Sequence, residues 1–185
     1  MAPRIRAAWP GARVSAPAFP VECSPGDNLA IHVAVAEAPV GHVLVVSVGM
    51  EFERGYWGEV LTTAAQARSI AGLVIDGGVR DVDALRSHNF PVFSTTIALR
   101  GATKQETGQI GGTTKVGNVD VGAGDWIVGD ADGVTVVPRA QVDDVLTAGR
   151  ARAEKERRFF EELRAGRTTL DLLGLDSSPI ERATD

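Results

Sequence analysis

The fold of this chain follows from ten residues near its middle, Gly72-Leu73-Val74-Ile75-Asp76-Gly77-Gly78-Val79-Arg80-Asp81. The apolar, partly β-branched run 73–75 predicts a short buried strand. Asp76 and two glycines follow, and they predict a sharp turn, because glycine reaches backbone angles that other residues avoid. A short helix is expected over 82–87. Arg80 and Asp81 therefore stand at the carboxyl end of a strand, where open α/β sheets usually bind ligands.

Arg80 and Asp81 have complementary chemistry for a small acidic ligand. Arginine presents a planar fork of donors that fits a carboxylate, and an aspartate oxygen suits Mg²⁺ or Mn²⁺. Neighbouring residues of this kind also form ordinary surface ion pairs at helix starts, which contribute little stability. The local sequence leaves a ligand site and a surface ion pair equally open.

The composition is that of an ordinary globular protein. The chain has 185 residues, of which 44% are hydrophobic and 23% charged, so a sizeable core can be buried. Its net charge is −5. Outside the predicted C-terminal helix there is no basic tract, so nucleic acid binding is not the expected function. The single cysteine, Cys23, excludes an internal disulfide framework and fits a reducing cytoplasm. No segment approaches the roughly 20 apolar residues that span a bilayer.

Helical and strand patterns together predict an α/β fold, with a central sheet flanked by helices. Helices are expected over 59–71 and 139–164 and, with strand as the open alternative, over 29–38. Strands are expected over 43–48, 91–95, 119–121, 126–130 and 133–137, with an irregular edge strand over 14–21. Long loops are expected over 49–58 and 96–118, the second with room for a hairpin.

The organisation along the chain predicts a core domain over 1–138, a helical extension of it over 139–175 and a frayed tail over 176–185. Within the extension, Glu154 and Glu156 belong to a set of carboxylates that alternate with basic residues. That alternation indicates a solvated helix face or a subunit contact rather than an RNA-binding surface.

Four segments, in order, resemble the RraA-like family. This family contains the class II 4-hydroxy-4-methyl-2-oxoglutarate/4-carboxy-4-hydroxy-2-oxoadipate aldolases and the regulator of ribonuclease activity. The segments are Ser24-Pro25-Gly26-Asp27-Asn28, Trp57-Gly58-Glu59-Val60-Leu61, Ile75-Asp76-Gly77-Gly78-Val79-Arg80-Asp81, and Gly124-Asp125 with Gly129-Asp130-Ala131-Asp132-Gly133-Val134. The resemblance implies a swivelling β/β/α-type domain with a C-terminal helix.

The resemblance also implies a site. The pyruvyl part of a substrate would be held by backbone amides of four residues, Gly58, Glu59, Val60 and Leu61. Arg80 would bind the same substrate, Asp81 would bind a divalent cation, and Glu59 would hold it through a water. The chemistry is consistent, because a glycine leaves room for a ligand and a helix N-terminus attracts an anion. Glu59 has a plainer interpretation as an ordinary carboxylate at a helix start.

The implied function is that of a divalent-metal-dependent lyase. It would cleave a 4-hydroxy-2-oxo acid by retro-aldol reaction to release pyruvate, with oxaloacetate decarboxylation through the same enolate. Lys104, in a predicted loop, either binds a second substrate carboxylate or is merely solvated. A lysine Schiff base is the rival mechanism, but no lysine lies in an evidently apolar strand. The alternative function is a regulator without catalysis that binds a ribonuclease or another protein.

The same resemblance implies a homotrimer or hexamer with the site at a subunit boundary. Tyr56 and Trp57, in a predicted loop, are residue types that interfaces favour. Phe159 and Phe160 lie on the charged helix, and an interface there would let Glu154 or Glu156 approach the Arg80/Asp81 site of a neighbour. Alternatively, the two phenylalanines pack on their own sheet.

The remaining candidates carry weaker signals. His32, His42 and His88 have no metal-ligand spacing, so they are expected to be structural or surface residues. A group of three carboxylates alternates with glycine and short strands, which favours turn formation over metal binding. Its members are Asp125, Asp130 and Asp132.

Overall fold

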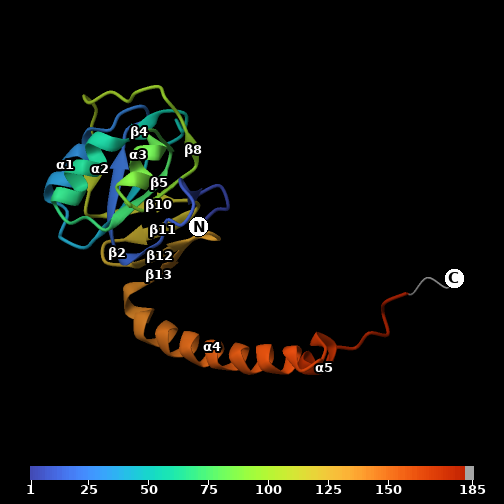
Figure 1. Ribbon diagram of the computed structural model, residues 1–185. Coiled ribbons are helices and arrows are strands. Elements are labelled where there is room, and N and C mark those ends of the chain that lie inside the picture. The colour runs from blue at the N-terminus through green and yellow to red at the C-terminus, as the bar shows by residue number, and fades with distance from the viewer. Residues whose placement is uncertain (182–185) are drawn as a thin grey trace. The chain divides into compact units, whose positions relative to one another are not determined.

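The structure is a computed structural model that describes residues 1–181 (Figure 1). It divides into two units, Met1–Ala140 and Gln141–Asp185. The first unit is a mixed α/β domain, which confirms the predicted fold class, and the second is helical.

Parallel strands form the centre of the main sheet, whose order is β1-β7-β5-β3-β2-β12-β13, with β9 paired to β2. β2, β3, β5 and β7 run parallel, and β1, β9, β12 and β13 each join antiparallel to a neighbour. The bounds are β1 Arg6–Ala7, β2 Val14–Cys23, β3 Val43–Ser47, β5 Gly72–Asp76, β7 Val92–Ser94, β9 Gly108–Ile110, β12 Trp126–Asp130 and β13 Gly133–Val137.

A smaller sheet of short parallel strands adjoins the main one. It contains β4 (Gly55–Trp57), β6 (Gly78–Val79) and β8 (Thr96–Ile97), in that order. β6 continues β5 after one residue, Gly77, and β8 continues β7 after one residue, Thr95. Two strands of the main sheet therefore run directly into the small sheet.

The chain bends at the predicted glycine turn, but the predicted reason, a backbone angle that only glycine reaches, is wrong. Gly77 and Gly78 do not have positive φ values, and the chain bends at Gly77 without reversing. Close packing accounts for the two glycines instead. A Cβ on Gly78 would lie 2.5 Å from the carbonyl oxygen of Arg54, and one on Gly77 would lie 2.8 Å from a methyl carbon of Val48. Glycine is needed here for space rather than for backbone angle.

Asp76 fixes the end of β5 just before this bend. Asp76 is 6% exposed, and its carboxylate accepts hydrogen bonds from Arg4 Nε at 2.9 Å, Arg4 Nη2 at 2.6 Å and the Gly117 amide at 2.9 Å. A buried carboxylate needs such a complete set of donors. The pairing ties the start of the chain to the strand that leads into the small sheet.

Three loop and edge predictions are corrected. β2 is not an irregular edge strand, because it pairs with β3, β9 and β12. Residues 96–118 are not one long loop, because they contain β8, β9 and β10 (Thr113–Val116), the last in a hairpin with β11 (Val119–Gly122). Long-range pairing of this kind is weakly encoded in local sequence.

The third correction concerns the predicted loop 49–58. It ends in β4, where Tyr56 is fully buried and Trp57 is 1% exposed. Trp57 stacks on Phe90 with ring centroids 5.8 Å apart, and its Nε1 donates to Thr62 Oγ1 at 2.7 Å. These aromatic residues belong to the core and do not support an interface.

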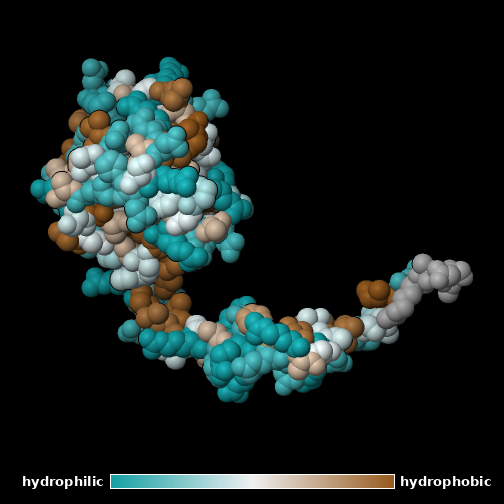
Figure 2. Space-filling model, viewed as in Figure 1, coloured by the Kyte–Doolittle hydropathy of each residue, from teal (hydrophilic) through white to brown (hydrophobic). Residues whose placement is uncertain are grey.

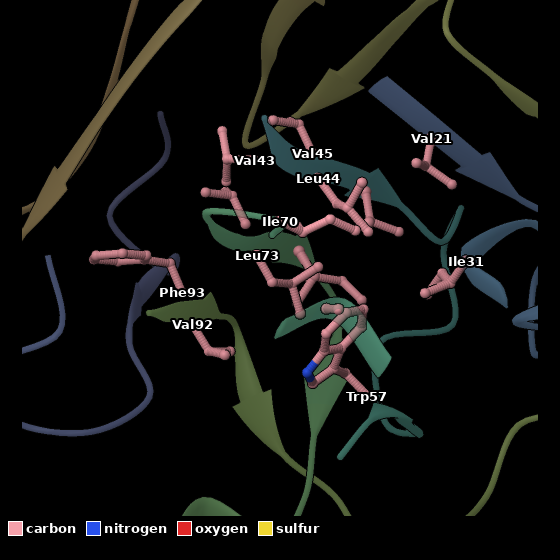
Figure 3. Packing of buried hydrophobic residues seen from close by; sticks show 14 of the residues in the cluster. Val21, Ile31, Val43, Leu44, Val45, Trp57, Ile70, Leu73, Val92 and Phe93 are labelled. Carbon is pink, nitrogen blue, oxygen red and sulfur yellow. The ribbon is translucent and has the colours of Figure 1, made fainter. Parts of the chain in front are cut away.

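The predicted helices of the first unit are confirmed. They are α1 (Leu29–Glu37), α2 (Glu59–Ala67) and α3 (Val82–Ser87). α2 ends four residues earlier than predicted, and Ser69 beyond it has a φ of 56°. The buried core lies between these helices and the central strands, and Figure 3 shows its aliphatic side chains beside Trp57 and Phe93.

The second unit contains α4 (Val142–Arg164) and α5 (Thr169–Leu173), after a short 3₁₀ helix, η1 (Arg139–Gln141). No residue of α4 is buried in the part of the chain that the structure describes. Its face in Figure 2 is mainly hydrophilic, with apolar side chains interspersed. Arg157 pairs with Glu154 at 2.8 Å and with Glu161 at 2.9 Å along the helix.

The end of the chain follows the predicted pattern in part. Gly166 has a φ of 95° just after α4, as expected for a glycine that ends a helix. Of the predicted frayed tail over 176–185, residues 182–185 lie outside the described residues. Within residues 1–181, no helix is both long and apolar enough to cross a bilayer.

Candidate active site

Arg80 and Asp81 connect the end of β6 to the start of α3. The Arg80 amide donates to the carbonyl of Trp57 at 2.9 Å, which holds this point of the chain against β4. Asp81 adopts a left-handed conformation with a φ of 59°. Aspartate tolerates that region better than most residues, although at some cost in strain. Such strain persists where surrounding contacts impose it and is frequent at functional sites.

The Asp81 carboxylate binds the start of a different helix from its own. Its Oδ2 accepts a hydrogen bond from the Glu59 amide at 3.0 Å, whereas it makes no side-chain cap on α3. Gly58, which precedes α2, allows this approach, because a Cβ there would lie 2.3 Å from Asp81 Oδ2 and 3.0 Å from Arg80 Cγ. The predicted cluster of Gly58, Glu59, Arg80 and Asp81 is thus brought together in space.

The surface ion pair that the sequence left open is present only in a loose form. Arg80 Nε lies 3.7 Å from Asp81 Oδ2, and the two side chains are 42% and 41% exposed. That distance is too long for a hydrogen bond. The guanidinium and the carboxylate therefore retain most of their capacity to bind other groups.

Arg80 lines a pocket of about 170 Å³. Lys104 also lines it, together with Gly58, Val60 and Leu61 of the predicted substrate-binding segment. The first-turn amides of a helix have no intrahelical acceptors. The Glu59 amide is already bound to Asp81, so those of Val60 and Leu61 remain for a ligand.

The pocket is cationic. Its lining includes Arg80 and Lys104, and the described residues place no carboxylate in it. Asp81 and Glu59 lie beside the pocket rather than in its lining. Helix dipole, guanidinium and ammonium all favour an anion at this position.

Two buried polar atoms in the pocket residues lack partners. Asn28 is 5% exposed, and its Nδ2 donates to the Tyr56 carbonyl at 2.8 Å, which fixes the orientation of the amide. Asn28 Oδ1 and His32 Nε2 have no hydrogen-bond partner among the described residues. Unpaired buried polar atoms are costly, so both are candidates to contact a ligand.

His32 was expected to be structural or a surface residue, and its place in the pocket was missed. Burial and then the charge of Lys104 lower the pKa of His32, which favours the neutral ring at physiological pH. Asn28 and His32 are four residues apart at the start of a helix, so they share one face. That spacing was the available signal in the sequence.

Glu59 is not part of the pocket lining. Its Oε1 lies 3.4 Å from His88 Nε2, and it is 57% exposed. His88 Nδ1 in turn lies 2.8 Å from Gln66 Oε1. The Glu59 carboxylate therefore stands in the first turn of α2 and contacts His88 just after α3.

The residues beside the pocket offer few protein ligands to a divalent cation. The described residues contain no cluster of three or more metal-binding side chains, and Asp81 is the one predicted direct ligand. Mg²⁺ commonly binds through one or two carboxylates while keeping several waters and substrate oxygens. A half-exposed Asp81 with Glu59 nearby is compatible with that mode.

Two of the three later carboxylates, Asp125 and Asp130, form turns as predicted, and Asp132 lies in the turn that follows Asp130. Asp125 Oδ2 accepts from the Gly122 amide at 2.8 Å, and Asp130 Oδ1 accepts from the Asp132 amide at 2.9 Å. A wider hollow of about 370 Å³ lies beside Met1, Asp130 and Asp132. Its arginine, Arg6, already donates to the Asp132 carbonyl, so the smaller cationic pocket is the candidate site.

Comparison with known proteins places this site in context. The model of the RraA-like family, described as Aldolase/RraA, matches residues 1–136. A protein from Halalkalibacterium halodurans, named provisionally as a 4-hydroxy-4-methyl-2-oxoglutarate aldolase, is 38% identical over 147 residues, which cover 79% of this chain and 70% of that protein.

Two solved structures share the fold. An uncharacterized protein from Pseudomonas syringae superposes with a TM-score of 0.81 at 31% identity, over 90% of this chain and 78% of the other. A Streptomyces coelicolor protein, described as an unusual member of the RNase ES inhibitor RraA protein family, superposes with a TM-score of 0.72 at 26% identity, over 86% of this chain and 82% of the other.

Proposed function

The chain belongs to the RraA-like family, and from this premise we propose that it is a lyase that cleaves a 4-hydroxy-2-oxo acid and releases pyruvate. The observation that carries the proposal is the convergence of Arg80, Lys104 and the start of α2 on one cationic pocket, with Asp81 beside it. A small acid with two carboxylates matches these groups. The aldolase name of the relative that is 38% identical supports the same reaction class.

Different residues of the pocket would bind different parts of the substrate. The pyruvyl carboxylate and 2-oxo oxygen would bind the amides of Val60 and Leu61 and the guanidinium of Arg80. The second carboxylate would bind Lys104. The unpaired atoms Asn28 Oδ1 and His32 Nε2 would face the polar middle of the substrate, where the 4-hydroxyl lies.

The chemistry is a retro-aldol cleavage. The 4-hydroxyl loses its proton, the C3–C4 bond breaks, and C4 leaves as the carbonyl carbon of the second product. The electron pair of the broken bond passes into the pyruvyl unit as an enolate. Arg80 stabilises the negative charge that develops on the 2-oxo oxygen. Protonation of C3 then gives pyruvate. Oxaloacetate decarboxylation passes through the same enolate, so it is proposed as a side activity.

A divalent cation, Mg²⁺ or Mn²⁺, is part of this proposal. Asp81 would hold it directly and Glu59 through a water, and when bound it would supply positive charge beside the 2-oxo oxygen. Asp81 is suited to this because its strained backbone and its bond to the Glu59 amide fix the carboxylate before any ligand arrives. The assembly proposed with this function is a homotrimer or hexamer.

The alternative is a regulator without catalysis that binds a ribonuclease or another protein. Its support is the likeness to the Streptomyces coelicolor structure from the RNase ES inhibitor family. A regulator needs no turnover, so activity measurements separate the two proposals.

The test is pyruvate release from a panel of 4-hydroxy-2-oxo acids, with Mg²⁺ and with EDTA. Turnover that EDTA abolishes supports the metal-dependent lyase. No turnover with any member, combined with tight binding to a ribonuclease, supports the regulator. Borohydride added with pyruvate provides a second check, because covalent trapping of pyruvate on the protein would indicate a lysine Schiff base in place of the proposed mechanism.

A further inference from the structure

Asp27 is a buried carboxylate that the proposed chemistry does not use. It is 1% exposed and does not line the pocket. Its Oδ1 accepts a hydrogen bond from the Leu29 amide at 2.8 Å, at the start of α1. Its Oδ2 accepts from Thr103 Oγ1 at 2.8 Å and from the Gln105 amide at 2.6 Å. One carboxylate therefore binds the residues on both sides of Lys104.

Backbone contacts extend this connection. The Asn28 amide donates to the Thr103 carbonyl at 2.9 Å, and the Thr103 amide donates to the Gly26 carbonyl at 2.9 Å. The segment that carries Lys104 is thus joined to the turn that precedes α1. The same turn supplies Asn28 to the pocket wall.

The charge of Asp27 is retained over a wide pH range. Burial alone would raise the pKa of Asp27, but the hydrogen bonds from Leu29, Gln105 and Thr103 outweigh it and lower the pKa to about 2. The group is an anion at neutral pH, and hydrogen bonds to an anionic acceptor are stronger than those between neutral groups. Such a group can hold a loop without direct support from ligand.

We propose that Asp27 is a positioning residue that fixes the loop around Lys104, and so holds the ammonium group at the pocket for the second carboxylate of a dicarboxylic 2-oxo acid. The proposal rests on the assignment of Lys104 made above. Asp27 acts through Lys104 and does not touch the ligand. Its loss should therefore weaken discrimination between ligands with and without a second carboxylate.

Binding measurements test this discrimination between ligands without catalytic turnover. The ligands are 2-oxoglutarate, a dicarboxylate without a 4-hydroxyl group, and 2-oxobutanoate, a monocarboxylate, each titrated calorimetrically with Mg²⁺ present. Asp27→Asn replaces an acceptor oxygen by a donor while keeping the shape. It should raise the Kd of 2-oxoglutarate about tenfold and leave that of 2-oxobutanoate unchanged. Lys104→Ala should do the same.

The double variant decides whether the two residues act together. If Asp27 works through Lys104, the combined variant binds 2-oxoglutarate no more weakly than Lys104→Ala alone. Additive losses, or equal losses for both ligands, would overturn the proposal, as would a wild-type protein that does not prefer the dicarboxylate. A failure of the lyase proposal shows separately, as binding with this pattern but without pyruvate release from the substrate panel.

A milder substitution covers the case in which Asp27→Asn does not fold. Thr103→Val removes one hydroxyl donor to Asp27 and keeps the side-chain shape. It should weaken 2-oxoglutarate binding by about threefold and leave 2-oxobutanoate binding unchanged. Unchanged binding of both ligands in a folded Thr103→Val protein would count against the proposal.

Discussion

The carboxylate oxygen Oδ2 of Asp81 lies 3.0 Å from the amide nitrogen of Glu59, although the two residues are 22 positions apart. This bond joins the carboxyl end of β6 to the start of α2. It also places the candidate metal ligand next to the helix N-terminus proposed to bind the substrate. The geometry of the site is therefore fixed largely by backbone, with Gly58 between the two groups.

Gly58→Ala should reduce activity about 100-fold, because displacement of about 1 Å in an active site can cost that much. The added Cβ would lie 2.3 Å from Asp81 Oδ2, so the carboxylate must move. Gly149→Ala is the matched control, since nothing lies within 4 Å of a Cβ there. Pyruvate release from both variants provides the measurement, and a fully active Gly58→Ala protein would show that Asp81 need not stay in place.

Asp81→Gly should lower metal-dependent turnover to below about 1% of wild type without loss of stability. Glycine accepts the φ of 59° at no steric cost, so the carboxylate is removed while backbone strain is relieved. Asp83→Ala, at an exposed position two residues on, is the control and should stay active. Thermal denaturation reports stability, and near-normal turnover of Asp81→Gly would remove Asp81 from the mechanism.

Arg80→Lys should lower kcat/KM about 100-fold, because lysine keeps the charge but loses the planar fork that binds a carboxylate or oxo group through two bonds. Arg86→Lys, on the exposed side of α3, should have no effect. Steady-state kinetics on the best substrate of the panel compares the two. Equal activity of both variants would mean that Arg80 contributes only charge.

Asp27 should contribute stability that depends on pH. Its pKa is about 2 in the folded protein and close to 3.8 in the unfolded chain, so the contribution is fully present above pH 3.8 and is lost as pH falls toward 2. Urea denaturation of wild type and Asp27→Asn from neutral pH to pH 2.5 measures it. The difference in unfolding free energy should shrink on acidification, and a constant difference would mean that charge is not the cause.

Mixing of inactive subunits tests the proposed assembly. Light scattering first establishes whether the protein is larger than its 19.5 kDa monomer, and a fully active monomer would exclude a shared site. Arg80→Ala and Glu156→Ala subunits, if each is inactive, should regain partial activity together only when the two residues come from different chains. Within one chain, Glu156 already pairs with Arg152 at 2.8 Å, so Arg152→Ala provides the control for loss of that pair.

The sequence predicted the elements with strong local patterns. The apolar run 43–48 is β3, the periodic segment after Gly58 is α2, and Arg80 and Asp81 lie at the end of a strand beside Gly58. These succeeded because a buried strand and an amphipathic helix each have a period that is readable within a few residues.

The failures involve contacts between distant segments. Gly77 and Gly78 are needed for space beside Val48 and Arg54, which no local turn pattern reveals. Tyr56 sits in a polar, glycine-containing stretch, yet it is fully buried. The pocket role of His32 likewise depends on Lys104, which lies far from it in sequence, and proximity of that kind follows only from the fold.

β5 continues into β6 through the single residue Gly77, so this connection provides no hinge. A one-residue connection allows little relative movement of the two strands. The Arg80 amide also donates a hydrogen bond to the carbonyl of Trp57, a core residue. Solvent exchange at that amide should therefore be slow, because its hydrogen bond to Trp57 must break before the amide can exchange. Asp27 likewise holds the loop that carries Lys104, so any motion during the proposed reaction would be confined to side chains, and the pocket would be largely preformed before a ligand binds.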